Sequence, residues 1–79
     1  MDVRVDSRVT FTKRELISNL IHYIRISYSV VSGANVNDSK RYYIYMNCRN
    51  SILLYFRVGI LTFREEQLLD AIVKRMFDK

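Results

Sequence analysis

The stretch RYYIYMNCRNSILLYFRV, residues 41–58, decides the fold class that this sequence predicts. It contains two runs rich in aromatic and β-branched residues, about 41–48 and 51–58, which meet near Arg49 and Asn50. Such a composition is typical of β-strands, because these side chains pack well on a pleated surface. We therefore expect the two runs to pair as a β-hairpin.

A three-residue connection gives this hairpin one consistent apolar face, whereas a two-residue turn would mix apolar and polar side chains on both faces. With the longer connection, the apolar face comprises Tyr42, Ile44, Met46, Cys48, Ile52, Leu54, Phe56 and Val58. The opposite face comprises Arg41, Tyr43, Tyr45, Asn47, Leu53, Tyr55 and Arg57. A solvated sheet face that carries rings and guanidinium groups is suited to holding another molecule.

The segment before the hairpin predicts one strand and one helix. Residues 3–11 alternate between apolar and polar, which indicates a strand with one buried face. Thr12 and Glu15 have the spacing of a capping box, and the apolar period that follows predicts a helix over 13–31. The apolar side of this helix is broader than packing on one sheet face requires. Gly33 is well placed as the left-handed residue that ends it.

The segment after the hairpin predicts a second helix. Gly59 ends the last strand or forms a bulge there, and Thr62 and Glu65 repeat the capping-box pattern ahead of a helix over 63–77. The order of elements is β-α-β-β-α. We predict an α+β fold with a three-stranded sheet and two helices on one face, which leaves the tyrosine-bearing face open. With 79 residues, the chain is expected to be a single small binding domain, 1–79.

Charge and composition favour a macromolecular partner. The chain has 13 Lys and Arg against 8 Asp and Glu, a net charge of +5, and 49% of its residues are hydrophobic. The charge favours an acidic partner, and the apolar content exceeds what a small core readily hides, which favours an interface or self-association. Cys48 is the single cysteine, and no secretion signal or membrane-spanning stretch is evident. We therefore expect a cytoplasmic location, in the host cytoplasm if the protein is viral.

The predicted binding site is the open sheet face, where two arginines of the first strand join the hairpin. Its candidate partner-binding residues are Arg4, Arg8, Arg41, Tyr43, Tyr45, Asn47, Leu53, Tyr55 and Arg57. Exposed rings beside arginines bind single-stranded nucleic acid on sheet platforms, and the same residue types anchor protein interfaces. Structural or homodimer packing of the tyrosines is the third interpretation.

Two further surfaces are candidates. Cations in the first turns of the two helices could hold phosphate, although ordinary exposed charge explains them as well. These cations are Lys13, Arg14 and Arg64. An apolar shoulder on the first helix could meet a second subunit, or could be covered by the first strand or by the loop at 32–40. This shoulder comprises Tyr23, Ile26 and Val30.

No catalytic or metal-binding pattern is evident. His22 is the only histidine and lies on the polar side of the first predicted helix, and the acidic residues show no paired-acid or metal-ligand spacing. Cys48 falls on the apolar face of the hairpin, which is typical of a small buried side chain rather than a nucleophile. We therefore expect no enzymatic activity, no cofactor and no metal.

Together these patterns predict a small protein that docks on another macromolecule through its Arg/Tyr-rich sheet face. The composition suggests an accessory or inhibitor protein of a phage or other mobile element, acting on a host protein. A protein partner and self-association as a homodimer are favoured, and no membrane partner is expected. The alternative is a small nucleic-acid-binding regulator that uses the same basic aromatic face and the helix N-termini, and a structural subunit of a larger assembly is a third interpretation.

Overall fold

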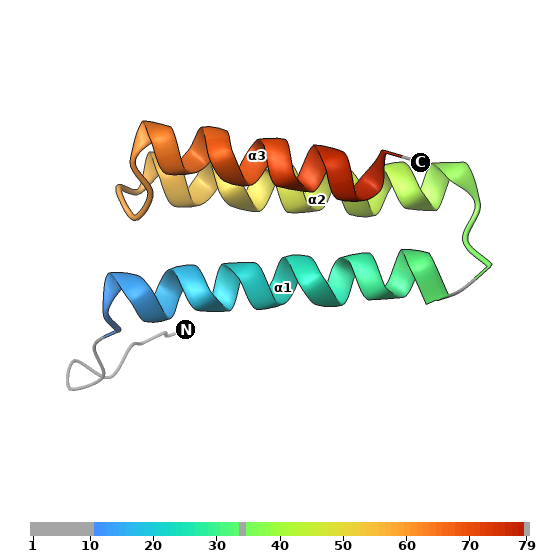
Figure 1. Ribbon diagram of the computed structural model, residues 1–79, viewed down its shortest axis with the longest axis horizontal. Helices are drawn as coiled ribbons and strands as arrows, with labels where there is room; N and C mark the ends of the chain where they lie inside the picture. The colour runs from blue at the N-terminus through green and yellow to red at the C-terminus, as the bar shows by residue number, and fades with distance from the viewer. Residues whose placement is uncertain (1–10, 34, 79) are drawn as a thin grey trace, which may run out of the picture.

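The computed structural model describes residues 11–33 and 35–78, and within them the chain forms three α-helices and no strand. Helix α1 spans Lys13–Gly33, α2 spans Asp38–Arg57 and α3 spans Phe63–Phe77. Each helix runs antiparallel to the preceding one, so α1 and α3 point in the same direction (Figure 1). The described part of the chain is an all-α three-helix bundle.

The predicted α+β fold is therefore wrong. The ranges expected to be the second and third strands, 41–48 and 51–58, both lie in α2 or at its C-terminal cap. The range expected to be the first strand, 3–11, lies outside the described residues except for Phe11, which precedes α1. No three-stranded sheet is present in the described chain, so the bundle has no open sheet face.

Local signals at both ends of α2 explain why this segment is helical. The Asn37 side chain caps the N-terminus, where its Oδ1 accepts the Lys40 N–H at 2.8 Å. No glycine or proline interrupts the chain from there to Gly59. At the C-terminus, the Gly59 N–H donates to the Phe56 carbonyl at 3.1 Å, and the Ile60 N–H donates to the Tyr55 carbonyl at 2.9 Å.

This pair of bonds is a Schellman motif, which needs a residue with positive φ just beyond the helix. Gly59 has φ +87°, a conformation that glycine adopts without the steric cost that a Cβ imposes. The expectation that Gly59 ends or bulges a strand is thus corrected, because it ends a helix. Gly33, expected in the left-handed position, is instead the last residue of α1.

The two capping boxes predicted from the sequence are confirmed. At α1, the Thr12 N–H donates to the Glu15 carboxylate at 2.8 Å, and the Glu15 N–H donates to the Thr12 hydroxyl at 3.1 Å. At α3, Thr62 and Glu65 make the same two bonds at 2.9 and 3.1 Å. Each box gives two backbone N–H groups at the helix start a side-chain acceptor, which is why both helices begin where the sequence predicts.

The core lies along the centre of the bundle and draws on all three helices. Its buried apolar residues are Leu20, Ile24, Val31, Cys48, Ile52, Leu61, Val73 and Phe77. At one end, the Phe77 ring lies 5.6 Å from the Tyr28 ring and 5.7 Å from the Tyr45 ring, which joins α3 to both other helices. Ser27 is buried too, and its hydroxyl donates to the Tyr23 carbonyl at 2.9 Å. Within residues 11–33 and 35–78, no helix has the length and apolar character needed to cross a bilayer.

Candidate functional site

The residues of the expected sheet face do not share one surface. An α-helix completes one turn every 3.6 residues, so side chains that would lie on one face of a strand are spread around α2. Tyr45 is half-buried beside Phe77, whereas Tyr43 is 66% exposed on another side of the helix. The α2 members of the expected face are Arg41, Tyr43, Tyr45, Asn47, Leu53, Tyr55 and Arg57.

Arg4 and Arg8, the remaining members of that face, lie outside the described residues. Docking through an Arg/Tyr-rich sheet face is therefore wrong for this protein. The accessory or inhibitor function expected of that face, and the nucleic-acid-binding alternative that used it, lose their structural basis with it. All of these predictions are wrong for one reason: each depended on a hairpin at residues 41–58, and that segment is helical.

The cations at the helix starts lie at the same end of the bundle. Lys13 Nζ is 3.2 Å from Glu65 Oε1, so the first turn of α1 is tied to the first turn of α3. Arg14 and Arg64 are exposed. The pKa of Glu65 is lowered, first by its hydrogen bond from the Thr62 backbone and then by Lys13. Phosphate binding by Lys13, Arg14 and Arg64 remains a prediction.

The apolar shoulder of α1 is solvent-exposed. Tyr23, Ile26 and Val30 are 42%, 50% and 46% exposed. Tyr23 lies over the seam with α2, since it lines a shallow hollow with Ser51 and Tyr55. The prediction that this shoulder meets a second subunit is thus compatible with its position.

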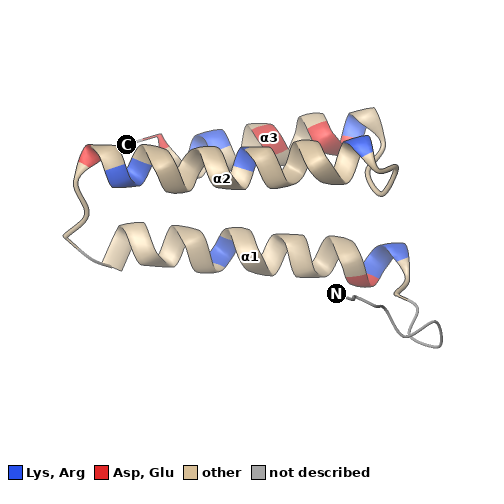
Figure 2. Cartoon of the chain, turned by 180° about the vertical axis from the view of Figure 1, so that it is seen from behind, with Lys and Arg blue, Asp and Glu red and all other residues tan. Residues whose placement is uncertain are grey.

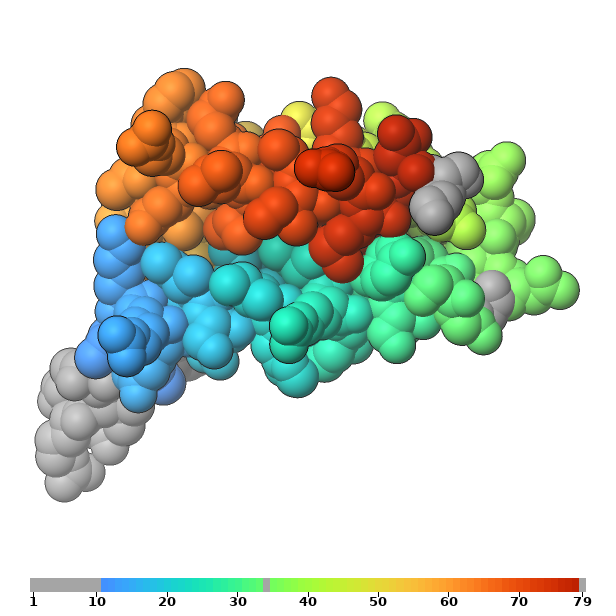
Figure 3. Space-filling model, in the orientation of Figure 1, coloured from blue at the N-terminus to red at the C-terminus, as the bar shows by residue number. Residues whose placement is uncertain are grey.

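Two apolar hollows that share Ile17, one along α1 and one between α1 and α3, together form a groove. It lies on the face seen in Figure 3, where α3 in orange and red meets α1 in blue, cyan and green. Its residues are Ile17 and Ile21 of α1, Leu61 of the preceding turn, and Leu68, Leu69 and Ile72 of α3. Leu61 is buried and forms the floor, whereas Leu68 and Ile72 are 58% and 51% exposed. The hollow beside Ile17 and Leu69 has a volume of about 240 Å³. We call these six residues the α1/α3 groove.

Arginines bracket this groove on both helices. On α1, Arg14 and Arg25 lie before and after Ile21 on the same side of the helix. On α3, Arg64 and Arg75 occupy the corresponding positions around Leu68 and Ile72. All four arginines are exposed. Glu65 is the acidic residue that lines the groove, and its charge is neutralised by the ion pair with Lys13 at one end of the groove. The rim of the groove is therefore positively charged.

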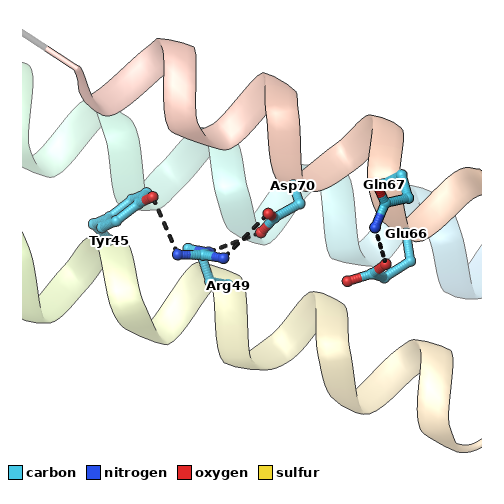
Figure 4. Close-up of polar contacts among 5 residues, drawn as sticks. All are labelled: Tyr45, Arg49, Glu66, Gln67 and Asp70. Carbon is cyan, nitrogen blue, oxygen red and sulfur yellow. Dashed lines mark hydrogen bonds and ion pairs between the residues drawn. The ribbon is translucent and has the colours of Figure 1, made fainter.

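A polar cluster between α2 and α3 serves the fold. Arg49 donates from Nε to Asp70 Oδ1 at 2.8 Å and from Nη2 to Asp70 Oδ2 at 3.2 Å, and its guanidinium lies 5.6 Å from the centre of the Tyr45 ring (Figure 4). The hydrogen bond to Asp70 raises the pKa of Arg49 further. Because each partner is satisfied by the other, this pair offers no free charge to a ligand.

Another hollow, of about 400 Å³, opens where the start of α2 meets the end of α3. It is lined by Asp38, Arg41, Tyr42, Tyr45, Lys74, Phe77 and Asp78. Two cations and two carboxylates balance there, so the hollow prefers neither anions nor cations. It lacks the consistent charge that distinguishes the rim of the α1/α3 groove.

Reactive side chains are few in the described part of the chain. Cys48 is fully buried in the helical core, and burial raises the pKa of its thiol against the opposing hydrogen bond with Ser27. His22 is exposed on the polar side of α1, as its sequence position predicts. Among residues 11–33 and 35–78, no three His, Cys, Asp or Glu side chains are grouped so that they could hold a metal ion.

The α1/α3 groove was not predicted as a site. The sequence pattern places Ile17, Ile21, Leu68 and Ile72 on the apolar sides of their helices, which normally means core. The one usable signal was the breadth of the apolar side of α1, which exceeds what one packing surface covers. No protein-family model, curated protein or solved structure matches the chain.

Proposed function

We propose that the protein is a non-catalytic binding module whose α1/α3 groove receives an amphipathic helix of a partner protein with acidic residues on both flanks. The observation that carries this proposal is the exposed apolar groove with arginines on both rims. Helices commonly dock by laying an apolar face into such a groove. The groove supplies the apolar contacts, and the arginines select the partner by charge.

The spacing of the arginines defines the length of the partner. Arg14 and Arg25 are separated by 11 positions, and so are Arg64 and Arg75. Eleven helical residues rise by about 16 Å, or three turns. Because α1 and α3 are parallel, the four arginines mark the corners of a site about three turns long. A partner helix with Asp or Glu near each end of a three-turn apolar stripe would pair with all four.

Charge disfavours a second copy of this chain in the groove. Two grooves facing one another would bring eight arginines together, and like charges across an interface cost affinity. An anionic membrane would also attract the rim, but the apolar residues line a groove between two helices, whereas a bilayer favours a convex apolar face. The partner that fits best is therefore an acidic helix.

We place this activity in the cytoplasm. The support is Cys48, the single cysteine of the sequence, whose thiol is free and buried in the core, which suits a reducing compartment. Neither a cofactor nor a metal enters the proposal.

A peptide titration tests the proposed site. The probe is a synthetic amphipathic helix of about 18 residues with leucines on one face and glutamates on both flanks. Added to isotopically labelled protein, it should shift the amide signals of Ile17, Leu68 and Ile72. A matched peptide with lysine in place of each glutamate should bind at least about 10-fold more weakly, which corresponds to ~1.4 kcal/mol.

Charge-reversal variants locate the binding to this rim. Arg25→Glu combined with Arg75→Glu should weaken binding of the glutamate peptide by about 10-fold or more, and added salt should shrink that difference. Arg57→Glu, at the exposed end of α2, is the matched control and should change the affinity little. Equal affinity for both peptides, or equal losses in the two variants, would refute the proposal. Binding only to vesicles of phosphatidylglycerol would assign the groove to a membrane instead.

A further inference from the structure

A second exposed apolar surface lies on the opposite side of α1, across the seam with α2. The α1 residues are Tyr23, Ile26 and Val30, and α2 with its C-terminal cap contributes Tyr43, Leu54 and Val58. On each helix these positions follow the three-and-four spacing that places side chains on one side. Tyr23 marks the seam, because it shares a hollow with Ser51 of α2. We call these six residues the α1/α2 face.

The centre of the α1/α2 face carries no charged side chain among the described residues. Arg25 is the only charged residue between Glu15 and the end of α1, which is otherwise free of Lys, Arg, Asp and Glu over this stretch (Figure 2). Its spacing from Arg14 and Ile21 puts it on the groove side of the helix. Between Arg41 and Arg57 of α2 the only charged residue is Arg49, which is paired with Asp70 of α3. This is unusual for a chain with a net charge of +5. A face without charge at its centre avoids the repulsion between like charges that would otherwise oppose the packing of two identical copies.

We propose that the α1/α2 face is the interface of a homodimer. An isologous interface brings each residue type against the same surface of the second copy, so a neutral face is self-compatible and a cationic face is not. The α1/α3 groove fails this requirement, and the α1/α2 face meets it. Asn19 and Asn47 lie on the same side of their helices as the apolar residues, and each amide can both donate to and accept from a copy of itself.

The exposed area supports a stable pair. Tyr43, Leu54 and Val58 are each more than half exposed, and Tyr23, Ile26 and Val30 are exposed by two fifths to one half. A half-exposed large side chain leaves on the order of 100 Å² uncovered, so six of them supply about 600 Å² of the ~800 Å² per partner of a standard interface. The asparagines and Ser51 between them supply the remainder. The inference does not depend on the peptide-binding role of the groove.

Sedimentation equilibrium of the full chain tests the dimer. At about 100 μM the wild-type protein should have twice the 9.5 kDa mass of the chain. Ile26→Lys, or Leu54→Lys on the other helix of the face, should reduce the mass to that of a monomer at the same concentration. Ile72→Lys in the groove places the same charge at a site of equal exposure and should leave the dimer intact. Circular dichroism of each variant confirms that it remains folded.

A second measurement needs no variant. On dilution of the wild-type protein from the dimeric to the monomeric range, the amide signals of Ile26 and Tyr43 should move, while those of Leu68 and Ile72 should not. A monomeric wild type at about 100 μM overturns the inference. So does a dimer that Ile72→Lys dissociates, or one whose dilution shifts map to the groove. The peptide titration tests the groove and sedimentation tests the dimer, so each proposal can be refuted without affecting the other.

Discussion

Cys48 illustrates how a single residue takes its chemistry from its surroundings. Its sequence pattern predicts the apolar face of a strand, and the structure places it in a helix, yet it is buried in both. Burial raises the pKa of its thiol and removes it from solvent. Since the thiolate is the reactive species, both effects make the side chain inert. Its role in the described structure is to pack against Ser27 and the neighbouring core.

We expect Cys48 to react with a water-soluble disulfide reagent only when the bundle opens. In the folded protein, modification should be at least about 100-fold slower than in denaturant, because access requires local or global unfolding. With a single cysteine, the absorbance of the released thiol reports this residue alone. Comparable rates with and without denaturant would show that the thiol is accessible in the native bundle.

Among the helices, α3 has the most clearly defined start. Thr62 and Glu65 exchange hydrogen bonds, and Lys13 of α1 reaches the same carboxylate. The bond from the Thr62 N–H stabilises the charged form of Glu65 and lowers its pKa. A carboxylate with a lowered pKa adds stability above its ordinary pKa, and this stability is lost as the pH falls through the lowered value. The cap of α3 therefore weakens in acid.

Glu65→Gln tests this pH dependence. Glutamine can still reach back to the Thr62 N–H, so the variant keeps the cap but loses the charge. The wild type should melt at a higher temperature than the variant near neutral pH, and the difference should shrink as the pH falls below about 4. Thermal melts of both proteins from neutral to acid pH measure it. A difference in melting temperature that stays constant over this range would contradict the assigned role of the charge.

Across the whole molecule, apolar and charged side chains are sorted onto different surfaces. Two apolar surfaces flank α1: arginines rim one of them, and none of the described residues places a charged side chain at the centre of the other. The third side of the bundle joins α2 to α3 through the Arg49–Asp70 pair, whose partners are 21 residues apart in the chain. That pair is only partly exposed and bidentate, so it contributes more than an ordinary surface ion pair.

Asp70→Asn should lower the free energy of unfolding by about 1 kcal/mol, which is a fall of ~5 °C in melting temperature for a chain this small. The loss should be smaller in high salt, because screening already weakens the wild-type pair. Asp78→Asn, at the exposed end of α3, is the control and should melt within about 1 °C of the wild type. Equal melting temperatures for Asp70→Asn and the wild type would show that the pair does not stabilise the bundle.

The sequence pattern predicts the three helices unequally well, for identifiable reasons. Helices over 13–31 and 63–77 were predicted nearly to the residue, since each has a capping box and an apolar side. The segment that forms α2 was assigned to a hairpin, because its aromatic and β-branched residues favour strands. The structure shows two helix signals that the strand prediction did not use, the Asn37 cap and the run without glycine up to Gly59. The candidate site failed with it, and the α1/α3 groove was hidden inside two stripes assigned to the core.

Short-range hydrogen bonds set where α1 and α3 begin, and they depend on residues three apart, so the order of amino acids was sufficient to locate both helices. Local sequence does not decide whether residues 38–57 form a helix or strands, because their apolar side chains lie all around the helix and also fit the alternation of a strand. Packing of Cys48 and Ile52 in the core, with Tyr45 and Tyr55 against them, settles it: Tyr45 and Cys48 are three residues apart, as are Ile52 and Tyr55, and this spacing shares one side in a helix but not in a strand. The same packing leaves Leu68, Ile72 and Ile26 exposed, since three helices offer more apolar surface than one shared core can cover.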